Sequence, residues 1–362
     1  MPNTNLRSQC HTFFSATPPR SAAQDFTEMA AWCEAHDIQH DSYGEGKLIQ
    51  DFENKVAALL GFEAARFVIT GTMTQTVALR IACQDKNNRL VALHPTAHVL
   101  LHESSNYQLL DHFTPLKVGA PYRPWTVDDL KAIPDRLGAA LYELPMREIG
   151  GQLPTWEELD AIKAYCHEQN IHLHLDGARL WEAAAGYDKP LNSVAAGFDS
   201  AYVSFYKGIG GLGGAMLLGS RDFIDRSSEW MKRMGGNVYQ RSPYVVAAAM
   251  RLDEKLARMP AYLQRTRDLY QLLTRYPGWQ VNPQQPHCNM LHIYFPVNLD
   301  TANTARDQLA KDHGVWLFGR VSDAALPQQC YIELYVGEAL LALSDEQVGT
   351  ILGQFQALLA TS

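Results

Sequence analysis

The stretch from Ile171 to Leu218 constrains the fold more than any other part of the sequence. It contains two apolar runs, residues 171–175 and 201–206, and each has the length and pattern of a buried strand. Asp176 directly follows the first run, and Lys207 directly follows the second. Ligands of open α/β sheets bind at the carboxyl ends of the strands. We therefore expect an α/β fold with a mostly parallel sheet, in which this carboxylate and this amine face one crevice.

This pair suits pyridoxal 5'-phosphate. The cofactor needs an amine for a Schiff base and an acidic partner for its pyridine nitrogen. Asp176 would keep that nitrogen protonated, and burial would lower the pKa of Lys207. An alternative without function stays open, in which Asp176 caps a helix and Lys207 is a solvated loop residue.

A further strand, tight turn and helix are expected over residues 66–82. Gly71 and Thr72 stand at the turn, directly before an apolar helical run. The free N–H groups and positive dipole of a helix N-terminus suit a phosphate. The turn therefore indicates a phosphate cradle, although Thr and Gly at such a place can also be a plain cap.

Two motifs carry a resemblance to a known family. Asp176-Gly177-Ala178-Arg179 and Lys207-Gly208 are similar to the DGAR and SKG motifs of the threonine aldolase family. That family belongs, with the aromatic β-eliminating lyases, to the aspartate-aminotransferase-like (fold type I) pyridoxal-phosphate enzymes. The likeness extends patchily from Leu6 to about Met290. It implies a large cofactor-binding domain with a mostly parallel sheet and a small C-terminal α/β domain.

The resemblance implies roles for cofactor-binding residues. Gly71, Thr72 and Met73 match the start of the family's phosphate cradle, TGTxxN. His98 matches the histidine that lies flat on the cofactor ring, so with Lys207 and Asp176 it is a candidate catalytic residue. Further expected cofactor contacts are Arg179 and Arg241.

Arg179 is expected to contact the cofactor oxygen or the substrate, and Arg241 a neighbouring subunit's phosphate. Further expected substrate residues are Ser8, of the family's LRS start, and Tyr43, of its YG loop. The last of this group is Arg320, the nearest candidate for the arginine that clamps the substrate carboxylate. Such shared sites imply a homodimer or homotetramer.

Two positions differ from the family pattern. The loop 144–151 lacks the histidine that is implicated in handling the substrate hydroxyl, and Glu143 or Arg147 are the nearby candidates to replace it. The strand expected near 331–335 lacks the carboxylate-binding arginine and carries Glu333 instead. These differences predict a substrate unlike threonine, with a bulkier aryl or modified side chain.

Composition limits the class of protein. The chain has 362 residues, 46% hydrophobic, with a net charge of −8, which argues against a nucleic-acid-binding surface. None of its six cysteines forms a CxxC pair, so we expect no zinc site or disulfide framework. The N-terminus lacks a signal-peptide pattern, and no apolar run approaches 18 residues. We expect a cytoplasmic protein without a membrane span.

Domain boundaries follow from the same patterns. We expect an N-terminal segment over residues 1–40, a large cofactor-binding domain over 41–242 and a small domain over 243–362. Thr155–Gln169 reads as a helix that Thr155 caps, with Glu157 and Glu158 in its first turn.

The sequence thus predicts a pyridoxal-phosphate lyase, most consistent with an aldolase that cleaves a β-hydroxy-α-amino acid to glycine and an aldehyde. The runner-up is β-elimination from an aromatic or sulfur amino acid. Two other classes stay open. His172, His174 and Asp176 share one face of a strand, so a metal-dependent hydrolase is conceivable, although we expect no metal site. The other is a protein that binds the cofactor without turnover.

Overall fold

The computed structural model describes residues 4–14 and 18–361. The chain forms two compact units. The large unit comprises Ser21–Glu148 and Leu153–Ala257, and the small unit comprises Met1–Arg20, Ile149–Gln152 and Arg258–Ser362. Each unit has its own sheet, and each is described by itself.

The two units divide the chain at other positions than the expected domains do. The expected boundary between residues 242 and 243 lies at the start of helix α12 (Ser242–Leu273), and the units divide further along that helix, after Ala257. The expected N-terminal segment 1–40 is shared between the units, with the change at Arg20.

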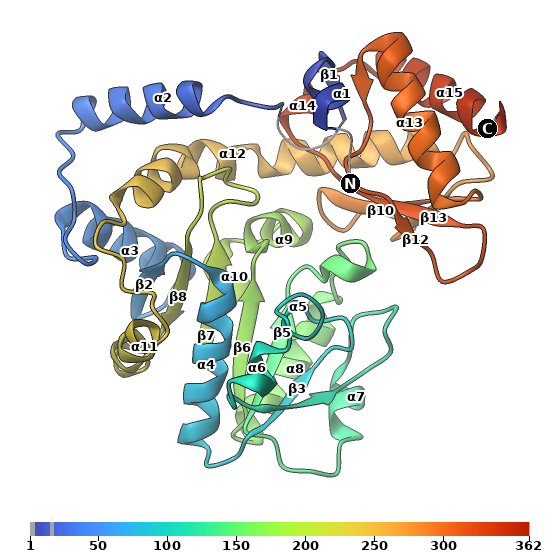
Figure 1. Cartoon of the computed structure of the whole chain (residues 1–362). Helices are drawn as coiled ribbons and strands as arrows, with labels where there is room; N and C mark the ends of the chain where they lie inside the picture. The colour runs from blue at the N-terminus through green and yellow to red at the C-terminus, as the bar shows by residue number, and fades with distance from the viewer. Residues whose placement is uncertain (1–3, 15–17, 362) are drawn as a thin grey trace. The chain divides into compact units, whose positions relative to one another are not determined.

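A seven-stranded sheet forms the centre of the large unit (Figure 1), in the order β2-β8-β7-β6-β5-β3-β4. Its strands are β2 (Ala64–Val68), β3 (Leu90–Leu93), β4 (Thr114–Lys117), β5 (Ala139–Glu143), β6 (His172–Gly177), β7 (Ser200–Ser204) and β8 (Ala215–Gly219). All neighbours from β7 to β4 are parallel, and β8 alone runs antiparallel to both of its neighbours. The mostly parallel sheet expected from the sequence is confirmed.

Burial explains which strands were visible in the sequence. Every residue of β5, β6, β7 and β8 is buried, and apart from His172, His174 and Asp176 of β6 these strands are mostly apolar. Strand β4 forms the edge, and its residues are exposed or half-buried. It therefore lacks an apolar run, and it was not predicted.

Helices pack on this sheet, and several of them follow its strands directly in the chain. Helix α4 (Gly71–Asp85) packs against β7 and β8 and also against α11 (Arg221–Arg233). Helix α8 (Trp156–Glu168) begins with the expected Thr155 cap, which forms a capping box with Glu158. The other helices are α2 (Ala22–Ala35), α3 (Lys47–Leu60), α5 (His98–Leu101), α6 (Asn106–Leu109), α7 (Val127–Lys131), η1 (Arg147–Ile149), α9 (Leu180–Tyr187) and α10 (Leu191–Ala195).

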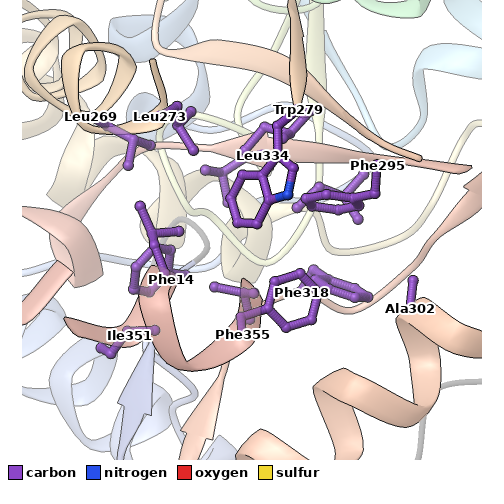
Figure 2. Close-up of a cluster of buried hydrophobic side chains, with 14 of the residues drawn as sticks. Phe14, Leu269, Leu273, Trp279, Phe295, Ala302, Phe318, Leu334, Ile351 and Phe355 are labelled. Atoms are coloured by element: carbon purple, nitrogen blue, oxygen red, sulfur yellow. The ribbon is translucent and has the colours of Figure 1, made fainter. Parts of the chain in front are cut away.

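The small unit contains a four-stranded antiparallel sheet in the order β12-β13-β10-β9. Its aromatic core includes Trp279, Phe295, Phe318 and Phe355, which Figure 2 shows clustered together. The strands of this sheet are β9 (Gln280–Asn282), β10 (Met290–Phe295), β12 (Ser322–Asp323) and β13 (Cys330–Tyr335). Strands β1 (Thr12–Phe13) and β11 (Val315–Trp316) pair with each other in a separate two-stranded sheet. The helices of the small unit, besides the end of α12, are α1 (Thr4–Ser8), α13 (Leu299–His313), α14 (Glu338–Leu341) and α15 (Asp345–Thr361).

Candidate functional site

Charged side chains gather where β3, β5, β6 and β7 end, and we call this region of the large unit the carboxyl edge. Asp176 is the fifth residue of β6 and pairs in register with Glu143 of β5 and Tyr202 of β7. Lys207 follows β7 by three residues, and His98 begins α5 after β3. The four strands are adjacent and parallel, so their ends lie along one edge of the sheet.

Asp176 is held as an acceptor. Its side chain is buried, with 1% of the residue exposed. Gln75 of α4 donates from Nε2 to Oδ2 at 2.8 Å, and the backbone N–H of Ala178 donates to Oδ1 at 3.1 Å. These two donors fix the orientation of the carboxyl group. Gln75 was not predicted, although its place one turn after Gly71 puts it on the face of α4 that meets the sheet.

Lys207 lies in a mixed electrostatic environment. Burial lowers the pKa of Lys207 to about 8, and the positive charges of Arg179 and Arg147 act in the same direction, whereas Asp176 and Glu143 oppose them. A pKa near 8 leaves roughly a tenth of this amine unprotonated at pH 7, far more than an ordinary lysine has, and a nucleophilic lysine requires the unprotonated form. Asp176 acts electrostatically on Lys207, and their shared role at one site stays a prediction.

Two glycines allow close approach at this edge. A Cβ on Gly71 would lie 2.2 Å from the hydroxyl of Tyr202, and a Cβ on Gly208 would lie 2.3 Å from Oε1 of Glu182. Thr70, before Gly71, caps α4 by accepting a hydrogen bond from the N–H of Met73 at 3.4 Å. Gly71 is the first residue of α4 and Thr72 is exposed, and backbone N–H groups at a helix N-terminus suit a small anion.

Glu143 is a second buried carboxyl group beside Asp176. Burial and the negative charge of Asp176 raise the pKa of Glu143 to about 7. The backbone N–H of Arg147 donates to its Oε1 at 3.1 Å. Like Asp176, Glu143 is an acidic residue at the end of a mostly apolar strand, and this pattern in the sequence marks it as a candidate site residue.

Two histidines of this edge each pair with a carboxylate. His98 Nε2 lies 3.0 Å from Glu103 Oε1, and His102 Nε2 lies 2.7 Å from Glu148 Oε1. Burial raises the pKa of Glu103, but hydrogen bonds from His98 and Thr72 outweigh it and leave the pKa below its usual value. The expected place of His98 near Lys207 agrees with this geometry, because Lys207 also acts on Glu103.

Arg179 and Arg241 are both buried, each with 8% of the residue exposed. Arg179 precedes α9 and acts electrostatically on Lys207 and Glu143. Arg241 bonds within its own subunit, donating to the carbonyl oxygen of Phe67 at 3.3 Å and to Asn237 at 2.9 Å. Its reach to a neighbouring subunit stays a prediction.

Tyr43 lines a cavity of about 720 Å³ together with Arg66 and Arg241. It is 55% exposed, and its ring contacts that of Tyr239 edge-on at 5.2 Å. Neither Lys207 nor Asp176 is among the residues that line this cavity.

Ser8 and Arg320 lie in the small unit. Ser8 ends α1, and Arg320 stands between β11 and β12. Both are exposed. Glu333 of β13, at the expected place of the missing arginine, faces His292 with Nε2 and Oε2 3.7 Å apart.

The histidines of β6 do not form a metal site. His172 and His174 both bond to the hydroxyl of Ser200, each at 2.7 Å. In residues 4–14 and 18–361, no group of three or more His, Cys, Asp or Glu side chains is arranged to hold a metal ion. The same residues include no helix that is long and apolar enough to span a membrane.

The chain is similar to one family of known proteins. The family model of the β-eliminating lyases matches residues 21–295. The low-specificity L-threonine aldolase of Escherichia coli K12 is 30% identical over 228 residues, which cover 61% of this chain and 68% of that enzyme. The corresponding enzyme of Eremothecium gossypii is 33% identical over 198 residues, covering 52% of this chain and about half (51%) of the relative.

Two solved structures match over nearly the whole chain. A Listeria monocytogenes EGD-E protein, provisionally assigned as an L-allo-threonine aldolase, is 35% identical with a TM-score of 0.91, over 98% of this chain and 99% of its own. A protein of Exiguobacterium sp. 255-15, provisionally assigned as an aromatic amino acid β-eliminating lyase or threonine aldolase, has the same identity and coverage and a TM-score of 0.92.

Proposed function

The chain belongs to the β-eliminating lyase family, which includes the threonine aldolases, and from that premise we propose that it cleaves β-hydroxy-α-amino acids to glycine and an aldehyde. It has the fold type I architecture expected from the sequence, and it is a lyase of this family. The observation that supports the proposed reaction is the partly buried Lys207, whose pKa is lowered to about 8 and on which the buried Asp176 acts electrostatically.

We propose pyridoxal 5'-phosphate as the cofactor, because the residues present fit it. The group needs an amine, an ionised carboxylate and a cradle for its phosphate. Lys207 offers the amine, Asp176 the carboxylate, and the α4 N-terminus at Gly71, Thr72 and Met73 the cradle. A Cβ at position 71 would clash with the hydroxyl of Tyr202, so the start of α4 can pack on Tyr202 only with glycine there.

When bound, the cofactor supplies an electron-withdrawing ring that weakens the bonds at the substrate Cα. Gln75 and the N–H of Ala178 keep Asp176 in the orientation and charge state that a protonated ring nitrogen requires. Glu103 fixes the imidazole of His98, so that the ring can lie flat over the site. Arg179 places a positive charge where a substrate carboxylate or a cofactor oxygen would bind.

The substrate contacts of Ser8, Tyr43 and Arg320, and the contact of Arg241 with a neighbouring phosphate, stay predictions. So does a homodimer or homotetramer with shared sites. We also propose a cytoplasmic location, which suits the free thiols of all six cysteines.

The test uses the protein reconstituted with pyridoxal phosphate and a panel of aliphatic and aryl β-hydroxy-α-amino acids. We expect a yellow protein that releases glycine and an aldehyde, with larger kcat/KM for the aryl substrates. Borohydride reduction followed by peptide mapping should place the adduct on Lys207. Lys207→Ala should abolish both, whereas Lys117→Met, at an exposed lysine of β4, should change neither.

The same assay separates the alternatives. Pyruvate and ammonia from an aromatic or sulfur amino acid, in place of glycine, would assign the chain to β-elimination, a reaction named in the description of the matched family. A yellow protein without turnover on either panel would contradict both reactions.

A further inference from the structure

The carboxyl edge contains two imidazole–carboxylate pairs, His98 with Glu103 and His102 with Glu148. The proposed function uses the first pair and not the second. His102 stands four residues after His98, directly after α5, and the two ring centroids are 4.9 Å apart with 38° between the ring planes. Its partner Glu148 comes from η1, in the loop after β5. Strands β3 and β5 are neighbours, so the ends of two adjacent strands bring this second pair together.

The second pair is connected to Lys207 through Arg147. The guanidinium of Arg147 lies 3.3 Å from Oε1 of Glu148, the oxygen that also contacts His102. Arg147 in turn acts electrostatically on Lys207. The side chains of His102 and Glu148 are 35% and 20% exposed, so solvent reaches both of them.

The contact fixes the tautomer of His102. An ionised carboxylate can only accept, so Nε2 of His102 carries the hydrogen that points at Glu148. Nδ1 then has a lone pair, and no residue in 4–14 or 18–361 hydrogen-bonds to it. This is the arrangement of a general base whose other nitrogen is held by a carboxylate.

We propose that His102, held by Glu148, accepts the proton of the substrate β-hydroxyl in the cleavage that the proposed function describes. It would do the work of the histidine that the loop 144–151 lacks, from the neighbouring strand end. The proposal rests on the proposed function, because only a β-hydroxy substrate carries this proton.

In this step, transfer of the hydroxyl proton accompanies cleavage of the Cα–Cβ bond. The O–H bond breaks, its proton moves to Nδ1 of His102, and its electron pair forms the second carbon–oxygen bond of the leaving aldehyde. The Cα–Cβ bond breaks, and its electron pair stays with the amino-acid fragment. That fragment takes up one proton at Cα and leaves as glycine, so no oxidant or reductant is needed. Glu148 stabilises the imidazolium while it carries the extra proton.

The experiment compares two reactions of one reconstituted enzyme. Cleavage of a β-hydroxy-α-amino acid needs the hydroxyl proton removed, whereas exchange of the glycine Cα hydrogen in deuterium oxide does not. We expect His102→Gln to lower kcat for cleavage by about 10²-fold or more and to leave glycine exchange within about threefold of the wild type. Glu148→Gln should give the same pattern with a smaller loss, about tenfold.

A matched control and a measurement without cofactor complete the test. His167→Gln, at an exposed histidine of α8, should leave both reactions unchanged. Nitrogen-15 NMR of histidine-labelled apoprotein should show His102 with its hydrogen on Nε2 in the wild type and a larger Nδ1–H share in Glu148→Gln.

Three results would overturn the proposal: equal losses of cleavage and exchange in His102→Gln, cleavage within threefold of the wild type in that variant, or a wild-type His102 with its hydrogen on Nδ1. If the wild type cleaves no β-hydroxy-α-amino acid, the proposed function fails instead, and the NMR result still tests whether Glu148 fixes the tautomer.

Discussion

Two histidine pairs of the large unit have contrasting surroundings. His98 and His102 lie at the carboxyl edge, partly exposed, and each faces its own carboxylate. His172 and His174 lie within β6, buried, and share the hydroxyl of Ser200. Burial lowers the pKa of His174 to about 3 and also lowers that of His172, so both stay neutral. A carboxylate partner stabilises the protonated form of an imidazole, whereas burial without such a partner disfavours it.

The contrast extends to the residues that support each pair. Glu103, Glu148 and Arg147 surround the edge pair, and such charged side chains can stabilise charge that forms on an imidazole during a reaction. Around the β6 pair stand Ser200 and the ring of Phe223, stacked on His172 at 5.4 Å between centroids. We therefore expect changes at the edge to alter catalysis, and changes around the β6 pair to alter stability.

The largest effect is expected at Asp176. Asp176→Asn keeps the shape of the side chain but removes the charge that the cofactor ring requires, so cleavage should fall by about 10³-fold. Steady-state kinetics with saturating cofactor measures this. Asp188→Asn is the matched control, because Asp188 is exposed and has a left-handed backbone that asparagine tolerates. A loss below tenfold would contradict the assigned role.

Glu103→Gln should have the next largest effect. Glu103 acts through His98, so its loss should lower kcat by about 10- to 100-fold with little change in KM. Glu168→Gln, at the exposed end of α8, is the control. A rise in KM at constant kcat would instead place Glu103 in substrate binding.

Glu143 links the edge to stability through pH. Its raised pKa of about 7 means that the folded protein keeps this proton while the unfolded chain releases it near the usual value for glutamate. The free energy of unfolding of the apoprotein should therefore fall by about 2–3 kcal/mol between about pH 4.5 and 7 from this group. Denaturant unfolding across that range should show a shallower decline in Glu143→Gln, and an identical slope in the two proteins would refute the link.

Ser200→Ala tests the opposite side of the comparison. It removes the partner shared by two buried imidazoles, so the free energy of unfolding should fall by about 1–3 kcal/mol. Because the β6 pair carries no proton in the reaction, kcat for cleavage should stay within about threefold of the wild type. A large loss of kcat in a stable variant would show that the β6 pair takes part in catalysis.

The smallest effect is expected from Arg147→Met. Arg147 helps to lower the pKa of Lys207, so its removal should raise that pKa, whereas the loss of the negative charge in Asp176→Asn should lower it. The initial rate at which the apoprotein takes up pyridoxal phosphate should rise with pH through a midpoint near 8 in the wild type. The midpoint should move upward in Arg147→Met, and a downward shift would contradict the arrangement.

Much of the fold could be predicted because it rests on local patterns. The helix expected over Thr155–Gln169 is α8, capped by Thr155 as predicted, and the strand expected near 331–335 is β13. Strand β4 was missed, because a half-exposed edge strand shows no apolar run.

The sequence by itself located the two buried strands β6 and β7, which overlap the predicted runs 171–175 and 201–206, because burial on both faces of a sheet favours apolar side chains. Only the tertiary structure decided which histidines have charged partners. His102 and Glu148 are 46 residues apart, and the parallel pairing of β3 with β5 is what brings them to 2.7 Å. Spacing within one segment could not reveal that contact, since it depends on how two separate strands align in the sheet.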